Sequence, residues 1–189
     1  MAFLFFFPLM MLSISIFSIS ALPHSYQYQH QQLLLRFKDA ISHNNITSLP
    51  DWTPHIPLCN WSAVTCNPSF KSVFALNLSH MNLHGTISPV IGNLSSLRSI
   101  DLSNNALNGH IPLELGRLTS LKYLYLGTNH LTGTIPHTLG NLSALVDLYL
   151  GENDLNGTIL HSLGNLSAVV TLGLGDNHLT GTIPPELGR

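Results

Sequence analysis

The fold is decided by residues 121–144, LKYLYLGTNHLTGTIPHTLGNLSA, which the chain repeats as LVDLYLGENDLNGTILHSLGNLSA over residues 145–168. The same 24-residue step continues outward in both directions from this pair. It holds for Leu78, Leu102, Leu126, Leu150 and Leu174, for Gly85, Gly109, Gly133, Gly157 and Gly181, and for Ile87, Ile111, Ile135, Ile159 and Ile183. A period kept through five units predicts a repeat architecture, in which each unit is one structural coil.

Each unit contains a short strand followed by an asparagine. Leu124 and Leu126 alternate with their neighbours, so both point inward from a strand whose other residues point outward. The asparagine after the strand is expected to be buried and to bind backbone groups of the adjacent coil. This column contains Asn105, Asn129, Asn153 and Asn177, and it starts at the second unit because Met81 stands in the first. In the following Leu-x-Gly-x-Ile-Pro segment, Pro112, Pro136 and Pro184 are expected to prevent regular helix.

One coil alone cannot bury its apolar edge, so the coils must stack into a curved solenoid. We therefore expect an α/β repeat solenoid with short parallel strands on its concave face and a helical, disulfide-bearing cap at its N-terminal end. The predicted organisation is a signal peptide over residues 1–22, a cap over 23–72 and about five repeats over 73–189. Leu34, Leu35, Phe37, Lys38 and Ile41 fit an amphipathic helix that covers the first coil.

The N-terminal segment predicts secretion. Residues 1–22 carry no charged side chain and are mostly apolar, which is typical of a cleaved signal peptide, with an uncleaved signal anchor as the alternative. Cys59 and Cys66 are close enough in sequence to pair in an oxidising compartment. Seven N-x-S/T sequons agree with this route, at Asn45, Asn60, Asn77, Asn93, Asn141, Asn156 and Asn165.

Composition excludes several functions. With 7 Lys and Arg against 9 Asp and Glu, the 189-residue chain offers no electrostatic basis for binding nucleic acid. The motifs G-x-S-x-G, H-E-x-x-H, H-R-D and D-F-G are missing, so no enzyme activity and no cofactor are predicted. The 11 histidines are scattered, which favours solvated surface residues over a metal site.

The L-x-G-x-I-P signature resembles the plant-specific class of leucine-rich repeats. Upstream, residues 33–42, 49–52 and 59–67 resemble the N-terminal cap of plant receptor-like kinases and their kinase-free relatives. Cys59, Trp61, Val64 and Cys66 match the cap motif C-x-W-x-G-V-x-C, while Ala63 replaces its glycine. Residues 85–105 most resemble receptor kinases of the immune type that sense microbial peptides.

The resemblance implies an extracellular or plasma-membrane protein that recognises a peptide or protein ligand, with a co-receptor ectodomain as a possible partner. Two alternatives stay open. One is a secreted kinase-free protein, such as an inhibitor of microbial wall-degrading enzymes, and the other is a short co-receptor ectodomain.

The candidate ligand site lies on the outward strand positions, which start at 75, 77, 79 and 80 and advance in steps of 24. The candidates on this concave face are Asp101, Tyr123, Tyr125, Asp147, Tyr149, Glu152 and Asp176. Tyrosines supply contact area, and neighbouring glycines at 127, 151, 173 and 175 would let a ligand backbone approach. Carboxylates favour a ligand with a basic residue or free amine. The alternative is a merely solvated sheet face.

Two further expectations concern the ends of the solenoid. A glycan on Asn77 would obstruct the N-terminal end of the concave face. At the other end, Gly188 and Arg189 repeat the pair Gly116 and Arg117, which leads directly into another strand. The fifth repeat is therefore expected to present an uncovered apolar edge.

Overall fold

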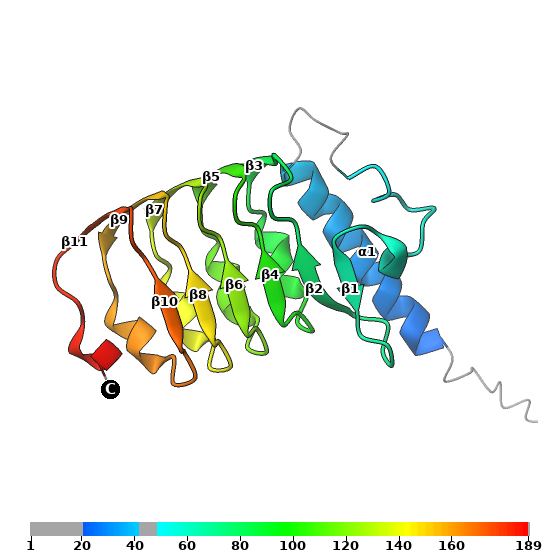
Figure 1. Cartoon of the computed structure of the whole chain (residues 1–189). Coiled ribbons are helices and arrows are strands. Elements are labelled where there is room, and N and C mark those ends of the chain that lie inside the picture. The colour runs from blue at the N-terminus through cyan, green and yellow to red at the C-terminus, as the bar shows by residue number, and fades with distance from the viewer. Residues whose placement is uncertain (1–20, 42–48, 189) are drawn as a thin grey trace, which may run out of the picture.

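The computed structural model describes residues 21–41 and 49–188, which form a curved stack of coils with a helical cap at one end (Figure 1). The helix α1 (Ala21–Ile41) lies beside the first coils. The predicted signal peptide lies outside the described residues except for Ala21 and Leu22, which begin α1, and the Asn45 sequon also lies outside them.

Six strands form the concave sheet. They are β1 (Val64–Cys66), β2 (Val73–Asn77), β4 (Ser99–Asp101), β6 (Tyr123–Tyr125), β8 (Asp147–Tyr149) and β10 (Thr171–Gly173), in that spatial order. The five strands of the repeats are parallel, and β1 from the cap pairs antiparallel with β2. Leu124 lies between Ile100 and Leu148, so the register advances by one repeat per strand and equivalent residues form columns. This confirms the predicted concave sheet.

A second parallel sheet was not predicted. It contains β3 (His84–Thr86), β5 (Ala106–His110), β7 (His130–Thr134), β9 (Asp154–Thr158) and β11 (His178–Thr180). In β5, β7 and β9 a single leucine is buried, such as Leu131, and a glycine with positive φ follows it two residues later within the strand. One apolar residue per strand is too short a pattern to reveal period-two alternation.

Short 3-10 helices close the coils on the convex side. They are η2 (Pro89–Asn93), η3 (Leu113–Arg117), η4 (His137–Asn141), η5 (His161–Asn165) and η6 (Pro185–Gly188). The Leu-x-Gly-x-Ile-Pro segments contain no regular helix, as predicted: β5 and β7 lie there, and the 3-10 helices η3 and η4 begin only after their N-cap residues Pro112 and Pro136. A proline fits this place because the first helical N–H groups have no intrahelical partner.

Leucine and isoleucine columns fill the interior, and the asparagine column connects the coils, as predicted. Asn129 is 7% exposed; its Nδ2 donates to the Leu102 and Leu126 carbonyl oxygens at 3.0 and 3.1 Å, and its Oδ1 accepts from the Leu107 N–H at 3.0 Å. In the first coil, the Met81 side chain does not form the hydrogen bonds of the asparagine column, but the Met81 N–H donates to Asn105 of the next coil.

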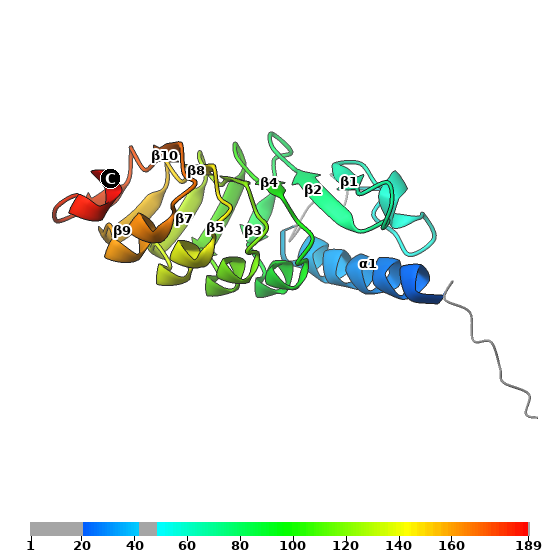
Figure 2. The same cartoon turned by 90° about the horizontal axis from the view of Figure 1, so that it is seen from below.

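The two ends of the stack differ in whether another element covers their apolar residues. At the first coil, α1 buries Leu34, Phe37 and Ile41, and it approaches so closely that a Cβ on Gly85 would lie 2.1 Å from the Ala40 carbonyl oxygen. Seen from below, α1 extends the row of short helices (Figure 2). In the fifth coil Val170 is 81% exposed, because no described coil covers it.

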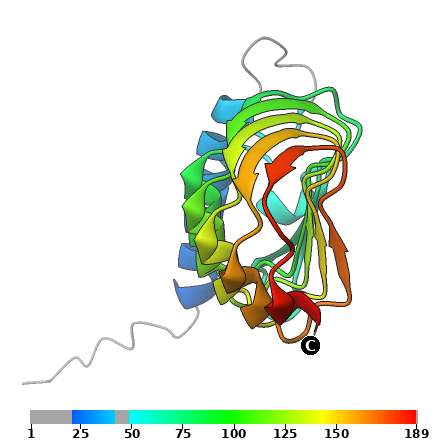
Figure 3. The same ribbon diagram turned by 90° about the vertical axis from the view of Figure 1, so that its left-hand side faces the viewer.

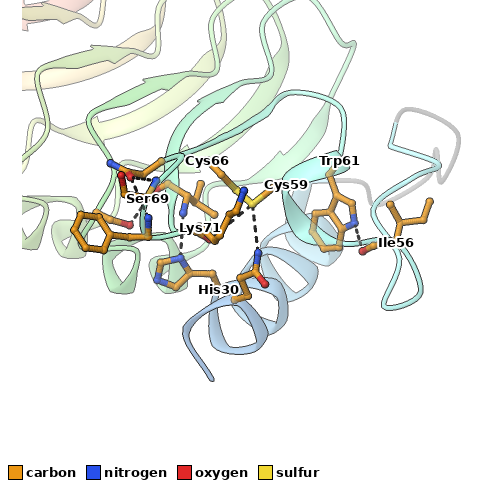
Figure 4. The surroundings of a disulfide bond; sticks show 12 residues. His30, Ile56, Cys59, Trp61, Cys66, Ser69 and Lys71 are labelled. Carbon is orange, nitrogen blue, oxygen red and sulfur yellow. Dashed lines mark hydrogen bonds between the residues drawn. A yellow bond between two sulfur atoms is a disulfide. The ribbon is translucent and has the colours of Figure 1, made fainter. Parts of the chain in front are cut away.

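The cap is held by a disulfide and two indoles. Cys59 and Cys66 are bonded, as predicted, with 5.5 Å between their Cα atoms. The rings of Trp52 and Trp61 stack with centroids 5.1 Å apart, and the Trp61 Nε1–H donates to the Ile56 carbonyl oxygen at 3.0 Å (Figure 4). The small core of this loop is thus supplemented by a covalent link.

Candidate ligand-binding groove

The concave sheet carries a groove of about 520 Å³ over the second to fifth coils. Viewed along the stack, the coils lie over one another, with the strands of this sheet on the side away from the short helices (Figure 3). The groove is lined by Asp101, Ser103, Asn104, Tyr125, Gly127, Thr128, Tyr149, Gly151, Glu152, Gly173, Gly175 and Asp176. Five of the seven predicted site residues therefore lie together in its wall, and Tyr123 and Asp147 lie beside it.

Three tyrosines form a continuous aromatic surface. The Tyr125 ring stacks on Tyr123 with centroids 6.4 Å apart and meets the Tyr149 ring of the next coil at 6.1 Å. Tyr149 is 47% exposed, and a Cβ on Gly173 would lie 2.9 Å from its ring. Gly173 therefore makes room for the Tyr149 ring, which lies over the following coil and remains about half exposed.

Asp147 orients Tyr125 rather than lining the groove. The Tyr125 hydroxyl donates to Asp147 Oδ2 at 2.9 Å. Burial and this hydrogen bond to a carboxylate raise the pKa of Tyr125 to about 12. The phenol thus stays neutral and its ring is fixed in one orientation, which lowers the entropy cost of using it as a contact surface.

A column of left-handed residues lines one wall of the groove. Asn104, Thr128, Glu152 and Asp176 have φ between 53° and 56°, and they follow each concave strand at the same phase. Asparagine and aspartate tolerate this conformation, but for a β-branched residue such as Thr128 it is strained by about 1–3 kcal/mol. Its hydroxyl donates to Glu152 Oε2 at 3.0 Å.

The 24-residue period predicts that this column points outward from the strands. Among its residues, however, only the charged ones were predicted to belong to the ligand site. Ser103, Asn104 and Thr128 were missed because an uncharged polar residue at an outward position has no distinguishing signal. The strained threonine becomes visible only with the backbone angles.

The glycines of one repeat have three different roles. Gly133 has φ +78°, so its conformation favours glycine, and Gly140 lacks space, because a Cβ there would lie 2.2 Å from the Ser162 carbonyl oxygen. Gly127 is less constrained: its φ is ordinary, but a Cβ there would lie 3.1 Å from the Gly151 carbonyl oxygen, which is a tight contact. Ser79 and Ser103 carry a side chain in the same column, so this position accepts one in the first two coils.

The groove has unbalanced negative charge. Asp101 accepts hydrogen bonds from the Ser103 N–H and hydroxyl, at 3.0 and 2.6 Å, and Glu152 accepts one from Thr128. Within residues 21–41 and 49–188, the ion pairs join His161 to Glu186 and His178 to Asp154, and neither pair belongs to the groove. Its carboxylates are thus available to a cationic ligand group.

The histidines give no metal site in the part of the chain that the structure describes. His30 corrects the expectation of surface histidines, because it is 5% exposed and its Nδ1 accepts the Val73 N–H at 3.3 Å (Figure 4). Burial lowers the pKa of His30. None of the described helices is long and apolar enough to cross a membrane.

Every sequon asparagine among the described residues is exposed: Asn60, Asn77, Asn93, Asn141, Asn156 and Asn165. Asn77 lies at the end of β2 on the concave sheet, beside Asp101 of β4. Its position fits the predicted glycan at the N-terminal end of the groove.

Comparison with known proteins agrees with this geometry. Residues 30–67 match a model described as leucine rich repeat N-terminal domain, and residues 96–118 and 119–179 match leucine rich repeat models. The receptor-like serine/threonine-protein kinase EFR of Arabidopsis thaliana is 48% identical over 68 residues, which cover 35% of this chain and 7% of that protein. The chain thus matches only a small part of such curated relatives.

Solved structures match over most of this chain. The ectodomain of the Arabidopsis thaliana receptor kinase GASSHO1/SCHENGEN3, in complex with CASPARIAN STRIP INTEGRITY FACTOR 2, has a TM-score of 0.82 and 40% identity over 84% of this chain and 19% of that one. The BIR2 ectodomain from Arabidopsis thaliana has a TM-score of 0.78 and 31% identity over 85% of this chain and 86% of that one. The fold is that of a leucine-rich repeat ectodomain, which is a non-catalytic fold. The chain belongs to the leucine-rich repeat family, in its branch of plant receptor ectodomains.

Proposed function

We propose that this chain is the extracellular ligand-recognition portion of a plant leucine-rich repeat receptor kinase, and that it binds a peptide or protein segment carrying a basic residue or free amine. The observation that carries the proposal is the concave groove, where Tyr125 and Tyr149 lie beside Asp101, Glu152 and Asp176. Several solved relatives hold peptide ligands, among them PEPR1 with AtPEP1 and HAESA with an IDA peptide hormone.

The shape of the groove supports an extended peptide. It runs across the coils, and Gly127 and Gly151 in its lining carry no side chain that would fill it. A ligand backbone can approach such a surface closely while its side chains contact the tyrosines. Proteins of this branch are extracellular or at the cell surface, and we propose the same location here.

The test is selection of peptides from a displayed random library on the full secreted chain. Binding of a selected peptide to the double variant Tyr125→Ala, Tyr149→Ala should weaken by about 30- to 1,000-fold, equivalent to about 2–4 kcal/mol. Circular dichroism should show that the variant remains folded. Unchanged affinity would place the ligand site outside the groove.

A second candidate function is that of a short ectodomain that binds another leucine-rich repeat ectodomain. It is favoured by the match to a chain of the BIR3–SERK2 complex from Arabidopsis thaliana, with a TM-score of 0.76 and 34% identity over 86% of that chain. In that case groove variants should leave ectodomain pairing intact, which sedimentation of the chain with candidate ectodomains would reveal.

A further inference from the structure

The helix α1 has two polar faces that differ in their contacts. One face is joined to the cap loop: the Gln31 amide donates to the Ile56 carbonyl oxygen at 3.0 Å, and the Lys38 ammonium donates to the Leu49 and Trp52 carbonyl oxygens at 2.9 and 3.1 Å. Long polar side chains on this face are therefore used as structural donors.

The other face is a stripe without such contacts. Tyr28, Gln32 and Arg36 are spaced four residues apart, so they lie along one side of the helix, with Gln29 and Leu33 beside them. In residues 26–41 and 49–188, no side-chain hydrogen bond, ion pair or ring contact engages Tyr28, Gln29, Gln32 or Arg36. The Tyr28 side chain is 63% exposed.

This stripe faces a sequon. A hollow of about 370 Å³ is lined by Tyr28, Gln29, Gln32, Leu33, Arg36 and Asn93. Asn93 is the exposed last residue of η2, and Asn93-Leu94-Ser95 is a sequon. The hollow is within the range of about 300–1,000 Å³ that is typical of small-molecule pockets.

We propose that the hollow holds the first sugars of an N-linked glycan on Asn93, which thereby fastens α1 to the first coil. In the attachment step, the Asn93 amide nitrogen bonds to C1 of a lipid-diphosphate-linked oligosaccharide and loses a proton, while the lipid diphosphate leaves. The Tyr28 ring offers an apolar face to the sugar ring, and Gln29, Gln32 and Arg36 supply donors for its hydroxyl and acetamide oxygens.

The repeats contain matched controls for this inference. Asn141 and Asn165 occupy the same phase as Asn93 in later coils and begin the same Asn-Leu-Ser sequon. On the side of these sites toward the cap lies another 3-10 helix and not α1, because η3 packs on η4 and η4 packs on η5. A glycan at these sites has no cap helix to contact.

The experiment uses the full chain expressed in a secretory host. Glycopeptide mass spectrometry should find Asn93 occupied, and Ser95→Ala, which removes that sequon, should lower the melting temperature by about 2–4 °C. The same change at Ser143, which removes the Asn141 sequon, should leave it unchanged. Tyr28→Ala should lower the melting temperature of the glycosylated chain but not that of the Ser95→Ala variant.

A second readout does not depend on stability. Enzymatic removal of the native glycan should be slower at Asn93 than at Asn141 by about an order of magnitude, and Tyr28→Ala should bring the two rates together. An unmodified Asn93, equal removal rates in the wild type, or equal effects of Ser95→Ala and Ser143→Ala would each overturn the proposal.

Discussion

The inward and outward faces of the concave strands differ in how strongly the 24-residue repeat restricts their residue types. The inward positions 100, 124, 148 and 172 are isoleucine or leucine, whereas the outward positions 101, 125, 149 and 173 are Asp, Tyr, Tyr and Gly. Coil stacking explains the first set, because each residue packs on its equivalent in the next coil. It does not dictate the second set, so the outward residues are where specificity for a ligand can be carried.

The asparagine column is the strongest test of the inward side. Asn129→Leu should destabilise the chain by about 3 kcal/mol or more, because the Leu107 N–H and the Leu102 carbonyl oxygen would lose their partner in a buried place. Denaturant unfolding measures the loss. The control Asn108→Leu, on an exposed position of β5, should change stability by no more than about 0.5 kcal/mol.

The glycines of residues 121–144 give a graded series within one coil. Gly140→Ala should cost about 2–3 kcal/mol, since its Cβ would overlap the Ser162 backbone. Gly133→Ala should cost about 1–2 kcal/mol, for its positive φ and because the His110 ring must move away from the new Cβ. Gly127→Ala should cost about 1 kcal/mol or less, because its Cβ would press only on the Gly151 carbonyl oxygen. A large loss at Gly127 would show that the groove glycines serve the fold after all.

Features that repeat along the chain, or that match a motif, could be predicted from the sequence. The concave strands, the asparagine ladder, the cap helix and the Cys59–Cys66 pair all follow from periodic or motif-like patterns. The second sheet was not predicted because Leu131 is the only buried apolar residue of β7, and β5 and β9 have the same pattern. The face that carries the site could be predicted, because strand alternation places Tyr125 and Tyr149 outward. The left-handed conformation of Thr128 and the Tyr125–Asp147 hydrogen bond could not, because they depend on backbone and side-chain angles that no sequence pattern encodes.

Acid should destabilise the cap through the buried His30. The folded-state pKa of His30 lies below its ordinary value, so the unfolded chain takes up a proton first as the pH falls. Stability should be at its full value above about pH 6.5 and should decline as the pH drops through and below that value. His30→Gln should remove this part of the decline, which thermal melts at intervals between about pH 7.5 and about pH 5 would measure. An unchanged slope would mean that His30 does not contribute.

The central claim is that the outward carboxylates of the groove select a cationic ligand. The direct measurement is the affinity of a library-selected peptide for the triple variant Asp101→Asn, Glu152→Gln, Asp176→Asn. The control variant, Asp39→Asn, Glu114→Gln, Asp154→Asn, changes the net charge equally at positions outside the groove. We expect the selected peptides to be rich in lysine or arginine. Affinity should fall by about tenfold or more in the groove variant and should change little in the control. Equal affinities for the two variants, or selected peptides without cationic residues, would contradict it.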